Sequence, residues 1–266
     1  MMPVVECQRV TNNLFMNRTV LITGAAIRIG NAIAHTLARA GWEVIVHAHR
    51  SRAQADALCA ELIADGKRAW RVTGDLQPPD GPDAVFDAAL AAAGRVDALV
   101  NNAAAFARQP LSAALPADFE RLWRINTFAP VRLTQRLAAH LTGRREPGCV
   151  INLLDQRVAS PGTGAIPYLL SKKALEAFTL SAALEFAPDL RINAVAPGAA
   201  LAPGPGAPQG NEPAGDFPLR ARPTPEQIAD AVRFLLDACA VTGQILYVDG
   251  GQHLGTGCRQ AVPLFP

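Results

Sequence analysis

The sequence predicts a single-domain α/β fold, in which helices cover both faces of a doubly wound parallel sheet of about seven strands. Three observations predict it. Short, continuous apolar runs recur along the chain, as expected of strands that are buried on both faces. Helical patterns long enough for crossover connections separate these runs. Glycines and polar residues follow the runs directly, at the sheet edge where such folds bind ligands.

The apolar runs predict the strands in chain order. The first strand, at residues 19–22, leads directly into the turn T-G-A-A-I-R-I-G of residues 23–30. Further strands are expected at residues 43–47, 69–72, 98–100, 150–154, 191–195 and 244–248. Because parallel strands end at the same edge of a sheet, we expect the segments that follow them to converge there.

Helical patterns fill the intervals between the strands. The first helix begins in the turn of residues 23–30 and continues to Ala40, where Gly41 stops it. The others are expected at residues 53–64, 83–93, about 117–141, 169–186 and 225–236. Helices of this length between parallel strands are typical of right-handed crossovers.

One domain, residues 18–266, accounts for all these elements. Residues 1–17 show no sustained periodicity, and we expect them to form a mobile N-terminal leader. Residues 198–222 are rich in Pro, Gly and Ala and lack periodicity, so we expect a mobile lid loop over the substrate.

Composition excludes several classes of function. The chain has 266 residues, half of them hydrophobic, which is ample for a sizeable core. A formal net charge of +2 without a basic stripe disfavours nucleic-acid binding. No apolar run approaches the roughly 20 residues of a membrane span, and the N-terminus lacks the order of a signal peptide.

The cysteines and histidines favour neither disulfides nor a metal site. The five cysteines are odd in number, scattered and without a C-x-x-C pair, which indicates free thiols in a reducing cytoplasm: Cys7, Cys59, Cys149, Cys239 and Cys258. His47 and His49 have no cysteine or carboxylate at ligand spacing. We therefore expect both histidines to serve packing, and no metal.

Tyr168 and Lys172 form the candidate catalytic pair. They lie four residues apart near the start of a helical stretch, so their side chains share one face. A nearby ammonium favours the phenolate, and we therefore expect Lys172 to lower the pKa of Tyr168. The chain has only two tyrosines and three lysines and uses arginine for most of its positive charges. A lysine at this position therefore indicates a need for the compact charge of an ammonium. Alone, however, such a pair is also common on solvated helix faces.

The segments after the first three strands predict a dinucleotide site. Amides and the helix dipole at the turn of residues 23–30 can hold a pyrophosphate, although a tight turn needing glycine for packing is the alternative. Arg50 replaces the acidic residue that accepts the ribose hydroxyls of NAD, which favours the 2′-phosphate of NADP. Arg28 and Ser51 offer further donors, but each arginine could equally be solvated. Asp75 is either an adenine contact or a simple cap.

These motifs in this order resemble the short-chain dehydrogenase/reductase family from residue 20 to residue 251. The matching segments are T-G-A-A-I-R-I-G, Gly74-Asp75, N-N-A from Asn101, Asn126, Y-L-L-S-K, A-P-G from Ala196 and V-D-G-G from Val248. The resemblance implies a Rossmann-like fold and a homotetramer, in which the tail after Gly251 would pack against another subunit. It also implies that Tyr168 is the acid, that Lys172 binds the nicotinamide ribose, and that Asn126 holds a water linking Lys172 to solvent.

Two departures from the family pattern resemble one of its branches, the pteridine reductases and bacterial dihydromonapterin reductases. Arg28 stands where most members have a glycine, and Asp155 where most have the catalytic serine. The segment H-A-H-R-S ending at Ser51 resembles the same branch, in which an aromatic residue at the place of Phe106 stacks on the pterin. Alanines at 104 and 105 replace that branch's serines. Phe106 as a plain core residue is the alternative.

The resemblance assigns every site residue that we expect. Catalysis would rest on Tyr168, Lys172, Asp155 and Asn126. The substrate would contact Arg28, Phe106, Asp155 and Tyr168, and partial burial would raise the pKa of Asp155. The cofactor, NADPH, would contact Gly24, Arg28, Ile29, Gly30, His49, Arg50, Ser51, Asp75, Leu76, Asn102, Ala103, Tyr168, Lys172, Pro197 and Gly198.

The sequence thus predicts an enzyme that reduces a pterin with NADPH, with Tyr168 as proton donor. One alternative is a carbonyl reductase of another ketone, in which Asp155 is an incidental replacement. A second, of another class, is a non-catalytic NADP-binding sensor, against which the retained Tyr168 and Lys172 argue. Dihydromonapterin, dihydrobiopterin, dihydrofolate and oxidised pterins all remain open as the substrate.

Overall fold

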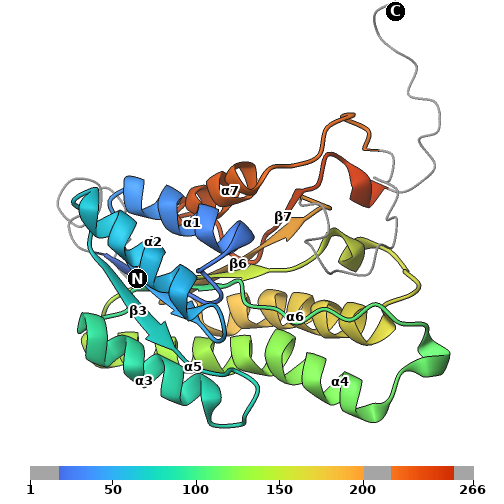
Figure 1. Ribbon diagram of the computed structural model, residues 1–266, viewed down its shortest axis with the longest axis horizontal. Coiled ribbons are helices and arrows are strands. Elements are labelled where there is room, and N and C mark those ends of the chain that lie inside the picture. Colours follow the sequence, from blue (N-terminus) through green and yellow to red (C-terminus); the bar gives the residue numbers. More distant parts are fainter. Residues whose placement is uncertain (1–17, 201–216, 255–266) are drawn as a thin grey trace, which may run out of the picture.

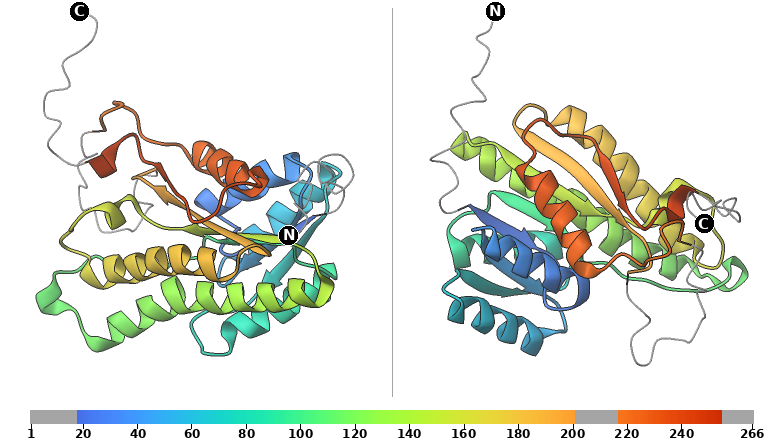
Figure 2. Two further views of the ribbon diagram at one scale, coloured as in Figure 1. Left: turned by 180° about the vertical axis from the view of Figure 1, so that it is seen from behind. Right: turned by 90° about the horizontal axis from the view of Figure 1, so that it is seen from above.

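A computed structural model describes residues 18–200 and 217–254 of the chain (Figure 1). The expected N-terminal leader, most of the expected lid and the tail after residue 254 lie outside the described residues. Within them, one parallel sheet forms the centre of the molecule, with helices on both faces (Figure 2). The expected fold class is confirmed.

Seven strands make up the sheet in the described part of the chain, in the order β3-β2-β1-β4-β5-β6-β7. Every neighbouring pair is parallel. The strands are β1 Thr19–Ile22, β2 Glu43–Ala48, β3 Ala69–Thr73, β4 Ala98–Asn101, β5 Gly148–Leu153, β6 Leu190–Pro197 and β7 Ile245–Val248. The order reverses between β1 and β4, where doubly wound sheets open a crevice at the carboxyl ends of the strands.

The helices divide between the two faces of the sheet (Figure 1). One face carries α1 Arg28–Arg39, α2 Arg52–Ala64 and α7 Pro225–Asp237, with α1 packed along α7. The other carries α3 Gly81–Ala93, α5 Ala129–Arg144 and α6 Ile166–Glu185, with α4 Pro116–Trp123 leading into α5. Short 3₁₀ turns lie at Leu111–Ala113, Gln156–Ala159 and Gln252–Leu254.

Each of the strands β1 to β6 contributes side chains to a hydrophobic core on either face of the sheet, which explains the continuous apolar runs. In β1, Val20 and Ile22 pack with α1, α2 and α7, whereas Leu21 packs with α3, α5 and α6. All three side chains are fully buried. Alternate residues of a strand point to opposite faces, so a strand covered on both sides needs apolar residues throughout.

The expected helix of residues 117–141 is interrupted. A π-helical turn, Arg124–Phe128, lies between α4 and α5. Such wide turns are rare and are frequently found at functional sites. Here the turn carries Asn126, whose side chain is fully buried.

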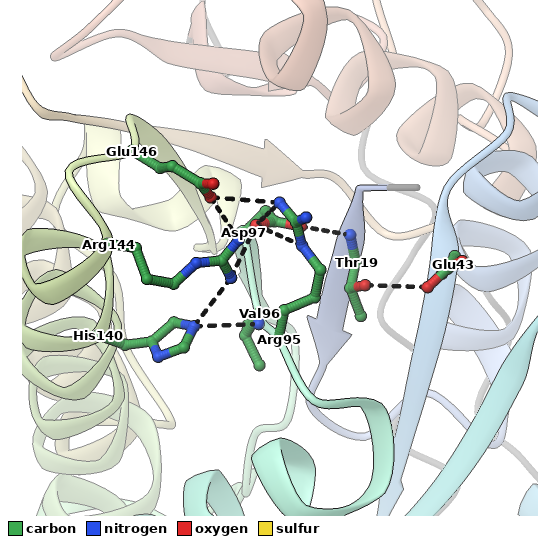
Figure 3. A network of polar contacts seen from close by, with 8 residues as sticks. All are labelled: Thr19, Glu43, Arg95, Val96, Asp97, His140, Arg144 and Glu146. Carbon is green, nitrogen blue, oxygen red and sulfur yellow. Dashed lines mark hydrogen bonds and ion pairs between the residues drawn. The ribbon is translucent and has the colours of Figure 1, made fainter. Parts of the chain in front are cut away.

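A polar cluster ties the amino ends of the strands together, at the edge of the sheet opposite to the crevice (Figure 3). Asp97, just before β4, accepts from the Thr19 backbone amide at 2.8 Å and from the forked guanidinium of Arg95. Glu146 joins the cluster through Arg95 and Arg144. The first residues of β1 and β2 are joined by a bond from the Thr19 hydroxyl to Glu43.

Candidate active site

A cavity of ≈ 1150 Å³ lies at the carboxyl ends of the strands. The segments after β1, β2, β3, β4, β5 and β6 all contribute to its wall. Pockets for one drug-sized ligand typically have about 300–1,000 Å³, so this cavity is large enough for a cofactor and a substrate together.

The turn between β1 and α1 forms one end of the cavity. Gly24 has a φ of +64°, and a Cβ on Gly30 would lie 2.3 Å from the Gly24 carbonyl oxygen. Glycine is therefore required at both positions. The Asn102 side-chain amide donates to the carbonyls of Thr23 and Gly24 and locks the turn. The first turn of α1 holds no acidic residue, so its free amides suit the pyrophosphate of a dinucleotide.

His47 holds this turn from the side of β2. The Gly24 amide donates to its Nδ1 at 3.2 Å, and its Nε2 lies 3.2 Å from the Gly74 carbonyl oxygen. Because Nδ1 accepts, the ring hydrogen belongs on Nε2, which donates to Gly74. Burial lowers the pKa of His47 to about 4, so the ring is neutral. The sequence predicts packing for this histidine, but not its hold on the glycine turn.

Side chains that can donate hydrogen bonds line the cavity beyond the turn. Arg28, Arg50 and Ser51 all contribute to its wall. Arg28 has a φ of 57°, in the left-handed region that glycine usually occupies. Asp75 accepts from the Gln77 amide as a local cap, and its carboxylate also lies 3.8 Å from Nδ1 of His49. The cap that the sequence allows for Asp75 is therefore present, and the residue also lines the cavity.

Tyr168, Lys172 and Asp155 meet at the other end of the cavity. Tyr168 and Lys172 lie one turn apart near the start of α6, and both are buried. The Tyr168 hydroxyl donates to Asp155 Oδ2 at 3.0 Å. The Lys172 ammonium donates to the carbonyl oxygen of Leu153, the last residue of β5, at 2.6 Å. The end of β5 thus supplies both acceptors: the Leu153 carbonyl for Lys172, and the Asp155 carboxylate, two residues further on, for Tyr168.

The electrostatics of this group differ from expectation. Burial and the Asp155 carboxylate raise the pKa of Tyr168 well above its ordinary value, so the expected lowering by Lys172 is wrong for this arrangement. The Asp155 carboxylate accepts directly from the phenol, whereas the Lys172 ammonium donates to a backbone carbonyl. Burial lowers the pKa of Lys172 to about 8, and Asp155 opposes that shift.

Arg157 is the residue that sequence reasoning missed. Its guanidinium forms two bonds to the Asp155 carboxylate, and its backbone amide forms a third. Burial raises the pKa of Asp155, but the bonds and charge of Arg157 outweigh it, so the pKa lies below its ordinary value. The expected rise is therefore wrong. The available signal was an arginine two residues after a carboxylate at the end of a strand.

Phe106 lies beside the same group. Its ring meets that of Tyr168 edge to face, with centroids 4.8 Å apart, and it is 52% exposed. Both rings line the cavity. Phe106 is therefore not a core residue, and its ring forms part of the cavity wall, with the Arg157 guanidinium 5.5 Å from the ring centroid.

Asn126 does not line the cavity, but its side chain holds part of the cavity wall in place. Its side-chain oxygen accepts from the Ala105 amide at 2.8 Å, and its nitrogen donates to the Ala105 carbonyl and to Ser171. These bonds hold the segment that carries Phe106 against α6. The water expected at Asn126 stays a prediction.

The structure brings all the other expected site residues to one cavity. Those that line it are Gly24, Arg28, Ile29, Gly30, His49, Arg50, Ser51, Asp75, Leu76, Asn102, Ala103, Phe106, Asp155, Tyr168, Lys172, Pro197 and Gly198. Among the described residues, no group of three or more His, Cys, Asp or Glu side chains is arranged to hold a metal ion. Nor does any helix in residues 18–200 or 217–254 have the length and apolarity to cross a membrane.

The fold and the cavity define an oxidoreductase of the dinucleotide-binding class, and comparison with known proteins defines the family. A family model described as enoyl-(acyl carrier protein) reductase, a branch of the short-chain dehydrogenase/reductases, matches residues 24–253. The chain belongs to the short-chain dehydrogenase/reductase family.

Three relatives illustrate the range of that similarity. The FolM alternative dihydrofolate reductase 1 of Brucella canis, solved with NADP, is 31% identical with a TM-score of 0.84, covering 94% of this chain and 97% of that one. Pteridine reductase 1 of Leishmania tarentolae is 32% identical, covering 88% of this chain and 96% of its own. The granaticin polyketide synthase putative ketoacyl reductase 2 of Streptomyces violaceoruber is 33% identical, covering 88% and 95%.

Proposed function

We propose that the protein reduces a pterin with NADPH, taking a dihydropterin or an oxidised pterin to the tetrahydro form. The observation that carries the proposal is the carboxylate of Asp155, 3.0 Å from the Tyr168 hydroxyl, beside the exposed ring of Phe106. A pterin is a flat ring with adjacent donors and acceptors, so it requires an aromatic face and hydrogen-bonding groups at its edge. The relatives named for dihydrofolate and pteridine reduction support this choice.

The cofactor assignment rests on the glycine turn and the arginines. The turn fits a pyrophosphate, since Gly24 and Gly30 leave the backbone open to close approach. Arg50 would meet the 2′-phosphate, and Arg28 the phosphates or the substrate. NADPH, when bound, supplies the hydride. The Brucella canis relative was solved with NADP, which supports the same assignment.

The proton would come from Tyr168. Its raised pKa keeps the hydroxyl protonated at neutral pH, as a proton donor requires. Lys172, with a pKa of about 8, remains largely an ammonium at neutral pH and would bind the nicotinamide ribose. Asp155 holds the hydroxyl in place. As a carboxylate it would accept from N–H groups of the ring at the positions that Arg157 now occupies.

A ketone reductase is the second candidate, because a ketoacyl reductase relative is as similar to this chain as the pteridine reductase. The residue at position 155 separates the two. A carbonyl substrate needs a hydroxyl that donates to its oxygen, and an ionised carboxylate cannot donate. Asp155 therefore favours a substrate with N–H donors.

The test is to follow NADPH absorbance with a panel of pterins beside a panel of ketones. Tyr168→Phe should lower turnover by roughly 10²- to 10⁴-fold and leave NADPH affinity intact. Asp155→Ser should reduce pterin turnover by about tenfold or more, and leave or improve any ketone turnover. Reduction of ketones but of no pterin would contradict the proposal.

The assembly and compartment belong to the same proposal. A homotetramer follows from the family resemblance, and light scattering of the full chain would measure it. A cytoplasmic location is supported by the described cysteines Cys59, Cys149 and Cys239, all of which are free thiols.

A further inference from the structure

Asp155 accepts four hydrogen bonds from its own chain. Its Oδ1 accepts from the Arg157 backbone amide at 2.9 Å and from Arg157 Nε at 3.1 Å. Its Oδ2 accepts from Arg157 Nη2 at 2.9 Å and from the Tyr168 hydroxyl at 3.0 Å. Because a carboxylate offers about four lone-pair sites, this one has no acceptor position left for a substrate.

The same guanidinium lies against both aromatic rings of the site. Its Cζ is 5.5 Å from the centroid of the Phe106 ring and 5.4 Å from that of Tyr168. These are distances at which a cation is attracted to an aromatic ring. Asp155, Phe106, Tyr168 and Arg157 all line the cavity, so Arg157 fills the corner that the carboxylate and the two rings form.

The chemistry of a guanidinium is close to that of the proposed substrate. It is planar, and it presents adjacent N–H donors to a carboxylate while offering a flat face to aromatic rings. The pyrimidine half of a pterin contains the same N–C(NH₂)–N group in a flat ring. Arg157 therefore makes the contacts that such a substrate would make.

We propose that the Arg157 guanidinium occupies the substrate position of this site, and that a substrate binds by displacing it from Asp155 and Phe106. The backbone amide of Arg157 and the Tyr168 hydroxyl can keep their bonds to Asp155, and a substrate then takes the two positions that the side chain leaves. The identity of the substrate rests on the proposed function. The displacement does not.

Displacement makes Arg157 a specificity-determining residue. A substrate replaces both contacts of the guanidinium only if it has a flat face and N–H donors. A ketone offers an acceptor and replaces neither contact. The electrostatics of Asp155 agree with this. Once the guanidinium has left, burial disfavours the ionised carboxylate and raises its pKa. An N–H donor of the substrate then stabilises the ionised carboxylate in place of the guanidinium.

Arg157→Met tests the displacement, since methionine fills similar space without donors or charge. At pH 8, where Asp155 is ionised in both proteins, the pterin KM should fall about three- to tenfold. The acid limb of the kcat/KM profile should move to higher pH by about one unit or more, because Asp155 loses its cationic partner. A pterin KM that is unchanged or raised at pH 8 would overturn the inference.

Arg95→Met is the matched control. It removes a fork of the same kind, from Arg95 to Asp97, at the opposite edge of the sheet (Figure 3). It should lower the melting temperature and leave the pterin KM and pH profile unchanged. An equal fall in the pterin KM in this variant would mean that any loosening of the fold lowers the KM, and would overturn the role of Arg157.

A binding measurement needs no turnover. Methylguanidinium should bind Arg157→Ala in calorimetric titrations and compete there with pterin, but should not bind the wild type, whose own guanidinium fills the corner. Where the truncated variants fail to fold, Arg157→Lys should give a smaller fall in KM in the same direction, because an ammonium keeps the charge without the fork.

The outcomes separate the two proposals. If neither the wild type nor Arg157→Met reduces a pterin, while methylguanidinium binds only the Arg157→Ala protein, the proposed function fails and the displacement stands. If pterins are reduced but neither the pterin KM nor methylguanidinium binding depends on Arg157, the displacement fails and the proposed function stands.

Discussion

Burial and one carboxylate together set the protonation of the catalytic pair. Burial raises the pKa of the Tyr168 phenol, and the charge of Asp155, which accepts from that hydroxyl, raises it further. The same charge also opposes the fall that burial causes in the pKa of Lys172. Both effects favour a protonated tyrosine beside an ammonium, which suits reduction, where the enzyme gives a proton, better than oxidation, where it takes one.

The preference for NADPH over NADH can be tested by replacing one residue, Arg50. It lines the cavity after β2, where an acidic residue would select NAD. A charge-assisted hydrogen bond contributes roughly 1.5–3 kcal/mol, so Arg50→Ala should weaken NADPH by about ten- to a hundredfold and barely affect NADH. Fluorescence titration with both cofactors would measure this, and equal losses for the two would contradict the assignment.

For single residues, the sequence predicted which side chains form the site better than it predicted their pKa shifts. Tyr168 and Lys172 share a helix face because of their spacing alone, so their proximity is predictable. The direction of a side chain in a short 3₁₀ turn is not. Arg157 lies in such a turn and folds back on Asp155, which reverses the expected pKa shift of that carboxylate.

Among the elements, β2 and the turn before α1 are joined through one histidine. His47 accepts from Gly24 and donates to Gly74, and it can do both only when neutral. Its pKa of about 4 in the folded protein lies below the ordinary value of 6.5, so unfolding takes up a proton at intermediate pH. The stability that it contributes is complete above pH 6.5 and is lost as pH falls toward 4.

His47→Gln tests this linkage. Between pH 7 and 4 the wild type should lose about 3 kcal/mol of unfolding free energy through this group. Glutamine keeps a donor and an acceptor without titrating in that range, so the variant should lose correspondingly less over the same interval. Urea unfolding at a series of pH values would measure both. Identical pH dependence in the two proteins would assign the loss to other groups.

Helix α7 has a capping box that can be tested apart from the site. The Thr224 hydroxyl accepts from the Gln227 amide, and the Gln227 side chain accepts from the Thr224 amide. Thr224→Ala should cost about 1 kcal/mol, a fall in Tm of about 2–4 °C for a chain of this size. Thr142→Ala, at an exposed position within α5, is the control and should change stability by less than about 0.5 kcal/mol. Equal losses in thermal scans would contradict the capping role.

Most elements were predictable because their periodicity is undisturbed, and the exception is informative. The sequence predicts one helix over residues 117–141, whereas the structure has α4, a π-helical turn and α5. Pro130 lies in that stretch and has no backbone N–H to donate, so an interruption near it could have been predicted, but its form as a π-helical turn could not. The turn is stabilised by tertiary bonds of Asn126 to Ala105 and Ser171, which local patterns cannot reveal.

In the whole molecule, the two edges of the sheet have separate tasks. The carboxyl edge carries the cavity, and the amino edge carries the polar cluster of Figure 3. Asp97 is 6% exposed and joins the start of β1 to β4 and to the end of α5. A buried carboxylate with this many donors is costly to remove, since its partners lose their counter-charge in a poorly solvated place.

Asp97→Ala should therefore cost about 3–5 kcal/mol of unfolding free energy, measured by urea denaturation. Asp237→Ala is the matched control, because that carboxylate is 42% exposed and pairs with Arg18 at 3.5 Å; its loss should cost about 1 kcal/mol or less. NADPH affinity should be unchanged in both variants, since the cluster lies at the edge opposite to the cavity. A cost for Asp97→Ala no larger than that for Asp237→Ala would mean that the amino ends are held by the packing of the strands alone. A loss of NADPH affinity in the folded Asp97→Ala protein would show that the two edges of the sheet are coupled.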